Sequence, residues 1–262
     1  MERRQFIRVC TASAASIAAA PDASAATAAT SIALNAKPYP RSKLVSASGG
    51  ALKASQLKVS KNYVFFYPFL GTPCFLLNLG KALKAAPVKA SGSAVGNAAG
   101  SAVGAAGTAR SIAPPAHPSY DWPGGAGAAK SVVAYSAICS HQLTYPTKDI
   151  SFISFRAGKS GANKHADVIH CCSEHSQYDP AAGARVLAGP APQPLAAILL
   201  EHDPATDELY ATGTLGGDMF NAFFRKYEMQ LTLDMGGRAR EAAGDVCAVS
   251  ELDNYCRQQV RC

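Results

Sequence analysis

The sequence predicts an all-β protein, a sandwich or barrel of short strands, and three features support this fold class. Residues 57–79 alternate and cluster β-branched and aromatic side chains, as in the run Tyr-Val-Phe-Phe-Tyr at 63–67. Strand-like stretches recur further along the chain, at 131–138, 167–170, 185–187, 196–201 and 208–213. Turn-forming residues separate them, notably Asp-Pro-Ala-Thr-Asp at 203–207. Many short strands with little helical periodicity favour one main antiparallel β domain.

Composition divides the 262 residues into a leader, a linker, a main domain and a tail. Residues 26–51 are rich in Ala, Ser, Thr and Pro without periodicity, so we expect a linker, with order beginning near residue 52. The main domain then spans 52–230. Within it, 82–130 consists mostly of small residues that cannot bury enough apolar surface to offset their ordering entropy, which predicts a low-complexity insertion. The more polar tail, 231–262, includes a short helix expected at 238–248.

The leader, residues 1–25, resembles a twin-arginine export signal. Arg3 and Arg4 form its charged head, apolar Phe6 and Ile7 follow, and an uncharged Ala-rich stretch leads to small residues suited to cleavage. This predicts export to the periplasm, with membrane contact if the signal is not cleaved. A disordered basic terminus is the alternative. The later apolar run at 63–79 is interrupted by proline and glycine, so it is not expected to span a membrane.

The net charge of +7 is spread along the chain in ones and twos. No run of like charges or interleaved aromatic pattern suggests a nucleic-acid surface, so we expect no nucleic-acid partner. A mildly basic face would suit docking to an acidic redox partner or an anionic membrane.

Two segments pair a thiol with an imidazole at a strand-to-loop boundary. They are Cys139-Ser140-His141 and Cys172-Ser173-Glu174-His175. A Rieske [2Fe-2S] cluster takes two thiolates on one iron and two imidazoles on the other, so one of each from each loop fits that need. We therefore expect Cys139, His141, Cys172 and His175 to be the ligands of the cluster.

The chain resembles Rieske iron–sulfur proteins, and within them the small subunit of arsenite oxidase. The resemblance rests on the two ligand segments, on Ser-Gln-Tyr-Asp-Pro at 176–180, on the residues before Cys139 and on 183–190. It implies a Rieske-type β-sandwich or barrel with a cluster-binding subdomain that exposes the imidazole edges to partners. It also implies electron transfer without an independent catalytic site. The expected partner is a cytochrome, a molybdenum-containing subunit or a quinol.

Three departures from the common Rieske pattern stand out. Residues 142–146 contain no cysteine, and Ser173-Glu174 replaces the usual Pro-Cys pair, so the usual disulfide between the two loops cannot form. Packing and hydrogen bonds alone are then expected to hold the loops. Ser176 follows His175 without the usual glycine. Because hydrogen bonds and exposure set the potential, we expect a lower potential than in quinol-oxidising relatives.

Several alternatives remain open at this point. Cys171 lies beside Cys172, and alternation along an extended segment lets only one of them reach the iron. The C-x-x-H spacing favours Cys172, which leaves Cys171 as a buried thiol, and His170 is read as a structural or supporting residue. A Cys₂His₂ zinc site in a non-redox binding module is the chemical alternative to the cluster. Among the remaining cysteines, Cys247 with Cys256 is a plausible disulfide, while Cys74 and Cys262 are unassigned.

Overall fold

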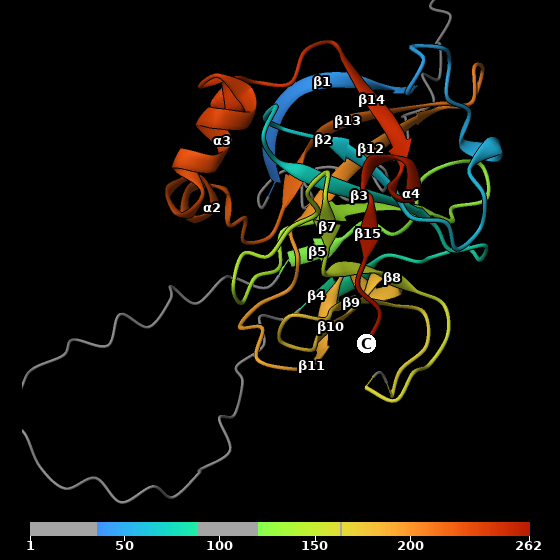
Figure 1. Ribbon diagram of the computed structural model, residues 1–262. Helices are drawn as coiled ribbons and strands as arrows, with labels where there is room; N and C mark the ends of the chain where they lie inside the picture. Colours follow the sequence, from blue (N-terminus) through green and yellow to red (C-terminus); the bar gives the residue numbers. More distant parts are fainter. Residues whose placement is uncertain (1–35, 89–119, 163) are drawn as a thin grey trace, which may run out of the picture.

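The computed structural model describes residues 36–88, 120–162 and 164–262 (Figure 1). The predicted leader and most of the predicted insertion lie outside these residues. Seven strands form a closed barrel, which confirms the all-β fold class. In barrel order they are β1 (Ala36–Ser46), β13 (Glu208–Leu215), β12 (Ala197–Asp203), β6 (Val132–Ser136), β3 (Pro73–Asn78), β2 (Tyr63–Phe66) and β14 (Val246–Glu251).

The barrel strands β2, β3 and β6 are buried on both faces. In β3, Cys74 and Leu76 belong to a core cluster to which all seven barrel strands contribute. Phe75 and Leu77, on the opposite face, belong to a second cluster shared with another sheet. Side chains alternate along a strand, so two apolar faces require a nearly continuous apolar run. This explains why the sequence of β3 is uniformly apolar up to Asn78.

The second sheet holds the predicted second ligand segment and is antiparallel, in the order β11–β10–β9–β8. Its strands are β8 (Ile153–Arg156), β9 (Val168–Cys171), β10 (Ser176–Asp179) and β11 (Arg185–Ala188). In Figure 1 it lies below the barrel, and the C-terminus ends beside it.

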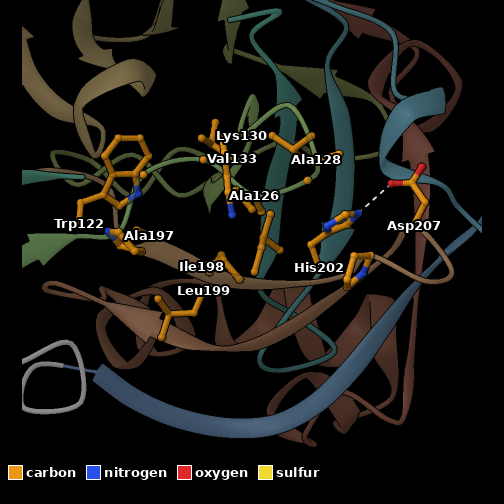
Figure 2. A pocket seen from close by; sticks show the side chains of 18 of the residues that line it. Trp122, Ala126, Ala128, Lys130, Val133, Ala197, Ile198, Leu199, His202 and Asp207 are labelled. Atoms are coloured by element: carbon orange, nitrogen blue, oxygen red, sulfur yellow. Dashed lines mark hydrogen bonds and ion pairs between the residues drawn. The ribbon is translucent and has the colours of Figure 1, made fainter. Parts of the chain in front are cut away.

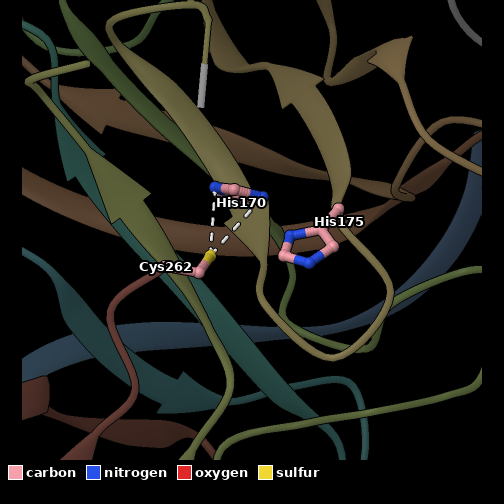
Figure 3. A group of neighbouring side chains, drawn as sticks. All are labelled: His170, His175 and Cys262. Carbon is pink, nitrogen blue, oxygen red and sulfur yellow. Dashed lines mark hydrogen bonds between the residues drawn. The ribbon is translucent and has the colours of Figure 1, made fainter. Parts of the chain in front are cut away.

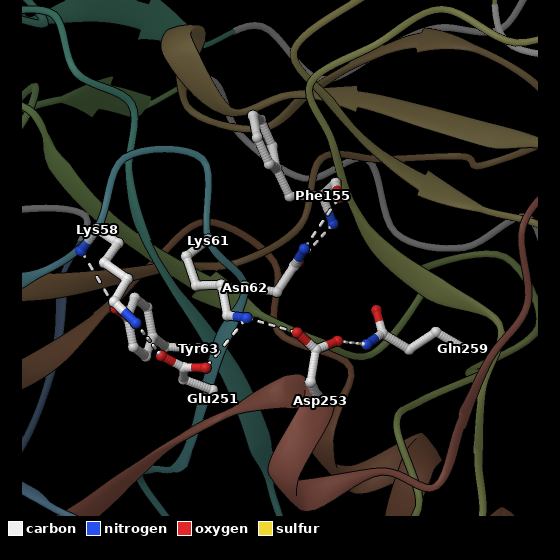
Figure 4. Close-up of polar contacts among 8 residues, drawn as sticks. All are labelled: Lys58, Lys61, Asn62, Tyr63, Phe155, Glu251, Asp253 and Gln259. Carbon is white, nitrogen blue, oxygen red and sulfur yellow. Dashed lines mark hydrogen bonds and ion pairs between the residues drawn. The ribbon is translucent and has the colours of Figure 1, made fainter.

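Asn62, just before β2, connects the barrel to this sheet. Its side-chain amide donates to the Phe155 carbonyl at 3.0 Å and accepts from the Phe155 N–H at 2.7 Å (Figure 4). Beside it, Lys61 bridges Glu251 and Asp253. Residues 61 and 62 thus connect the start of β2 both to the second sheet and to the segment around β14 and α4.

The remaining elements are short. Strand β4 (Ala86–Val88) pairs with β5 (Tyr120–Trp122), and β7 (Ile150–Ser151) pairs with β15 (Gln258–Gln259). The α-helices are α2 (Phe220–Lys226), α3 (Glu228–Met235) and α4 (Leu252–Tyr255), and the 3₁₀ turns are Ala54–Gln56, Pro180–Ala182 and Arg238–Arg240. Within the described part of the chain, no helix is long and apolar enough to cross a membrane.

Three boundary predictions were wrong. The expected linker includes strand β1, which pairs with β13 and β14. The expected tail contributes β14 to the barrel and β15 to a two-stranded sheet. The helix expected at 238–248 is a single 3₁₀ turn followed by the start of β14. In each case, pairing with distant strands outweighs the local composition.

Candidate metal centre

Two loops from different sheets meet at the predicted cluster site. The first follows β6 and is closed by two backbone hydrogen bonds: the Cys139 N–H donates to the Thr144 carbonyl at 2.8 Å, and the Leu143 N–H donates to the Cys139 carbonyl at 2.9 Å. The second is the β9–β10 hairpin, in which Cys171 lies opposite Ser176. Its last residue, His175, has a φ of 56°, a left-handed conformation in which glycine is the least strained residue.

The structure places Cys139 beside Cys171. Both thiols are free and their residues are fully buried, and the two side chains are hydrogen-bonded to each other. Alternation along β9 turns Ile169 and Cys171 into the same apolar cluster as Cys139. The pair therefore links the two loops at the edge of the core.

The surroundings of this pair stabilise a thiolate on Cys139. The hydrogen bond from Cys171, followed by those from Tyr178 and two backbone N–H groups, lowers the pKa of Cys139 to about 6 despite burial. The same shared hydrogen bond, together with burial, raises the pKa of Cys171. The backbone N–H groups of Ser173 and Glu174 also favour a thiolate on Cys171. Each sulfur thus has N–H donors from its own loop, two and three residues downstream.

Tyr178 connects the second sheet to the first loop. Its hydroxyl lies 3.2 Å from the Cys139 sulfur and accepts from the Ser140 N–H at 3.2 Å. Ser140 in turn donates from its hydroxyl to the Gln193 carbonyl at 2.7 Å. Burial, followed by the nearby Cys139, raises the pKa of Tyr178, so the phenol keeps its proton and can donate to the sulfur.

Two of the buried side-chain atoms that lack a hydrogen-bond partner among the described residues lie next to the proposed ligands: Nδ1 of His141 and Oγ of Ser176. The others belong to Tyr145, Gln177 and Thr214. A buried polar atom left unpaired costs about 1–3 kcal/mol, so such atoms usually have a partner. His141 Nδ1 is a metal-ligand atom, and Ser176 Oγ can donate to an acceptor such as sulfide. Both atoms therefore fit a bound inorganic group between the loops.

The predicted ligand set is wrong at Cys172. This residue forms a disulfide with Cys262, 90 residues away, with 5.7 Å between the two Cα atoms. Its side chain leaves β9 on the other face from Cys171, as strand alternation requires. The two neighbouring thiols therefore point to opposite faces, as expected, but the choice of Cys172 from the C-x-x-H spacing was wrong for this structure. The prediction that packing and hydrogen bonds alone hold the loops was wrong too.

The suggested disulfide between Cys247 and Cys256 is not formed. Both thiols are free, and each donates a hydrogen bond to a backbone carbonyl, Phe66 for Cys247 and Gln258 for Cys256. Cys74 is also a free buried thiol.

His175 lies on the other face of β9, away from the thiol pair, in a group with His170 and Cys262 (Figure 3). One potential ligand atom from each of the three lies within 4.8 Å of the others. The two imidazole rings are 5.7 Å apart between centroids, and the Cys262 sulfur is 3.5 Å from Nδ1 of His170. Burial, followed by the nearby His175 and Arg156, lowers the pKa of His170. Of the four predicted ligands, Cys172 and His175 thus lie with His170 and Cys262, whereas Cys139 lies beside Cys171.

A cavity of about 740 Å³ opens elsewhere, between strand β12 and the segment that precedes β6 (Figure 2). Trp122 and Ile198 line it, and His202 Nε2 lies 2.8 Å from Asp207 Oδ1 at one end. None of its lining residues belongs to either cysteine loop. It is therefore separate from the candidate metal centre.

No family model matches the sequence. Among solved structures, the chain is similar to the soluble domain of the Rieske protein II (soxF) from Sulfolobus acidocaldarius, with 26% identity, 67% of this chain and 78% of that chain covered, and a TM-score of 0.42. That structure is a Rieske protein domain. The expected likeness to the small subunit of arsenite oxidase stays a prediction.

Proposed function

We propose that this protein carries a Rieske-type [2Fe-2S] cluster and transfers electrons, either as a carrier or as the small subunit of an exported oxidoreductase. The observation that supports it best is the buried pair of free thiols, Cys139 and Cys171, in which each sulfur has N–H donors from its own loop. Thiolates held in this way are the usual ligands of iron–sulfur clusters.

The proposed ligands are Cys139 and Cys171 on one iron and His141 and His175 on the other. His141 offers its unpaired Nδ1 atom from the first loop. His175 is exposed on the second loop and has its ring beside His170, so its participation requires that loop to turn. Cys171 replaces Cys172 in the set because the sulfur of Cys172 is bonded to Cys262.

When bound, the cluster supplies one-electron redox chemistry. Tyr178 and the backbone N–H groups of residues 141 and 142 donate to the Cys139 sulfur, and such donors favour the more negative, reduced state. His141 and His175 are partly or fully exposed, so partners can reach them. A ligand imidazole can lose the proton on its outer nitrogen on oxidation, which couples proton release to electron transfer.

The proposed location and partners follow from the sequence. The leader supports export through the twin-arginine route to the periplasm, and an uncleaved leader would keep the protein at the membrane. The partner is proposed to be a cytochrome, a molybdenum-containing subunit or a quinol.

A matched set of variants tests the cluster and distinguishes the two neighbouring cysteines. Cys171→Ser is expected to abolish visible absorption and bound iron, because it removes a proposed ligand. The double variant Cys172→Ser with Cys262→Ser is expected to keep both. If Cys171→Ser kept iron and colour while the double variant lost them, Cys172 would be the ligand and the assignment of Cys171 would be wrong. Zinc in place of iron in the wild-type protein, without colour, would support the zinc-stabilised, non-redox module instead.

A further inference from the structure

Four side chains that can bind a metal lie together at the outer face of β9. The proposed cluster does not account for this grouping. His170 is buried on this face, His175 follows on the hairpin, and Cys262 at the C-terminus reaches both (Figure 3). Cys172 is covalently bonded to Cys262, so its sulfur is necessarily part of the same group. Two thiols and two imidazoles are the donors of many structural zinc sites.

We propose that opening the Cys172–Cys262 disulfide creates a binding site for one soft divalent cation, such as Zn²⁺, formed by Cys172, Cys262, His170 and His175. We call it the tail site. It involves neither Cys139 nor Cys171, and it lies on the opposite face of β9 from that pair.

The distances suit tetrahedral coordination. With Zn–S of about 2.3 Å and Zn–N of about 2.0–2.1 Å, a tetrahedral angle places a sulfur and a nitrogen about 3.6 Å apart. The Cys262 sulfur lies 3.5 Å from Nδ1 and 3.6 Å from Nε2 of His170. The third donor, on His175, is within 4.8 Å of the others, so a small rotation of this exposed side chain completes the group.

The redox step balances with a dithiol reductant. The reductant gives two electrons and two protons to the Cys172–Cys262 bond, which becomes two thiols, and the reductant itself becomes a disulfide. Binding of the cation then releases the two thiol protons. Two thiolates neutralise the dication, so Arg156, which faces His170, meets no net positive charge.

The tail site would fix the C-terminus to the β9–β10 hairpin under reducing conditions, as the disulfide does under oxidising conditions. Strand β15 already holds the tail nearby by pairing with β7, so both thiols stay close when the bond opens. Because the tail is already held in place, it loses less conformational entropy when the cation binds, so less of the binding free energy is needed to offset that loss. The site shares His175 with the proposed cluster, and this overlap is the one point that rests on the proposed function.

The test is a Co²⁺ titration of cluster-free, full-length protein, with and without a dithiol or phosphine reductant. Reduced wild-type protein is expected to bind one more equivalent than Cys262→Ser, with sulfur-to-cobalt absorption in the near ultraviolet. Binding at Cys139 and Cys171 contributes equally to both proteins, so the difference reports the tail site. His170→Gln, which keeps every cysteine, is expected to weaken this equivalent at least tenfold and remains informative if Cys262→Ser fails to fold.

Equal stoichiometry in reduced wild-type protein and Cys262→Ser would overturn the proposal. An unchanged affinity in His170→Gln would overturn it too, as would the same extra equivalent in the oxidised wild-type protein. None of these readouts depends on the cluster. The iron content of the Cys171→Ser variant tests the proposed function separately, so the two proposals can fail independently.

Discussion

Removing the Cys172–Cys262 disulfide is expected to cost the protein a large part of its stability. The bond closes a loop of 90 residues that contains β10 to β15. In the chain-entropy model, opening a loop of this length raises the entropy of the unfolded state by about 15.5 cal/mol/K, which lowers the free energy of unfolding by about 4.6 kcal/mol at 25 °C. For a protein of this size, the corresponding drop in the melting temperature is roughly 10 °C or more.

The assay is urea and thermal unfolding, followed by circular dichroism, of oxidised wild-type protein and the double variant Cys172→Ser with Cys262→Ser. Wild-type protein in reductant without metal serves as the control and should match the double variant, which itself should not respond to reductant. Mass spectrometry after thiol labelling counts the free cysteines in each sample. A loss below about 1 kcal/mol, or a labelling pattern with Cys172 and Cys262 free in oxidised protein, would refute the reasoning.

Three further predictions follow from the hydrogen bonds. Tyr178→Phe removes the phenol that donates a hydrogen bond to the proposed Cys139 ligand. Taking about 1 kcal/mol for this hydrogen bond, we expect the reduction potential to fall by roughly 40 mV. Protein-film voltammetry measures the potential, and an unchanged value would argue against the contact. Asn62→Ala leaves the Phe155 backbone groups without their side-chain partners and is expected to destabilise the protein by about 2 kcal/mol in urea unfolding, whereas a loss below about 0.5 kcal/mol would contradict the bridging role. Hydrogen bonds from Ser55 and His202 lower the pKa of Asp207 to about 2, so the ionised carboxylate stabilises the fold above pH 4 and this stabilisation is lost as the pH falls towards 2. Asp207→Asn is expected to remove the fall in melting temperature between these pH values. A pH profile identical to that of the wild-type protein would contradict this role of Asp207.

The sequence predicted those strands whose own residues favour extended structure. Strand β6 is expected from 131–138 and observed at Val132–Ser136, and β13 is expected from 208–213 and observed at Glu208–Leu215. Both contain β-branched or aromatic side chains in the buried core. Strand β1 lacks this signal, because its first half includes two prolines and two basic residues. It becomes a strand through pairing with β13 and β14, contacts that a local pattern cannot reveal.

The candidate site was predicted in part. Cys139 was predicted from its C-x-H pair with His141 at the end of a predicted strand, and in the structure Cys139 is buried in the loop after β6. The choice between Cys171 and Cys172 rested on the C-x-x-H spacing, whereas in the structure Cys171 faces the core and Cys172 is bonded to Cys262. Strand boundaries are the least reliable part of a sequence-based prediction.

The role of Cys262 could not have been found from local spacing, because it lies 90 residues from Cys172. The parallel pairing of β15 with β7, together with a hydrogen bond from Arg156 in β8 to the Val260 carbonyl, brings the C-terminal segment to the second sheet. An unassigned cysteine was the one available signal, and cysteine pairing cannot be deduced from sequence. The fold, rather than any motif, therefore explains the group of His170, His175 and Cys262.

Pulsed electron paramagnetic resonance of the reduced wild-type protein tests the central claim most directly, because it reports which nuclei surround the iron. We expect a cluster signal with nitrogen couplings from two histidines, one of which disappears in His141→Ala. A signal without nitrogen couplings would contradict imidazole ligation. Iron-free protein without any signal, after maturation with iron and sulfide, would contradict the cluster itself.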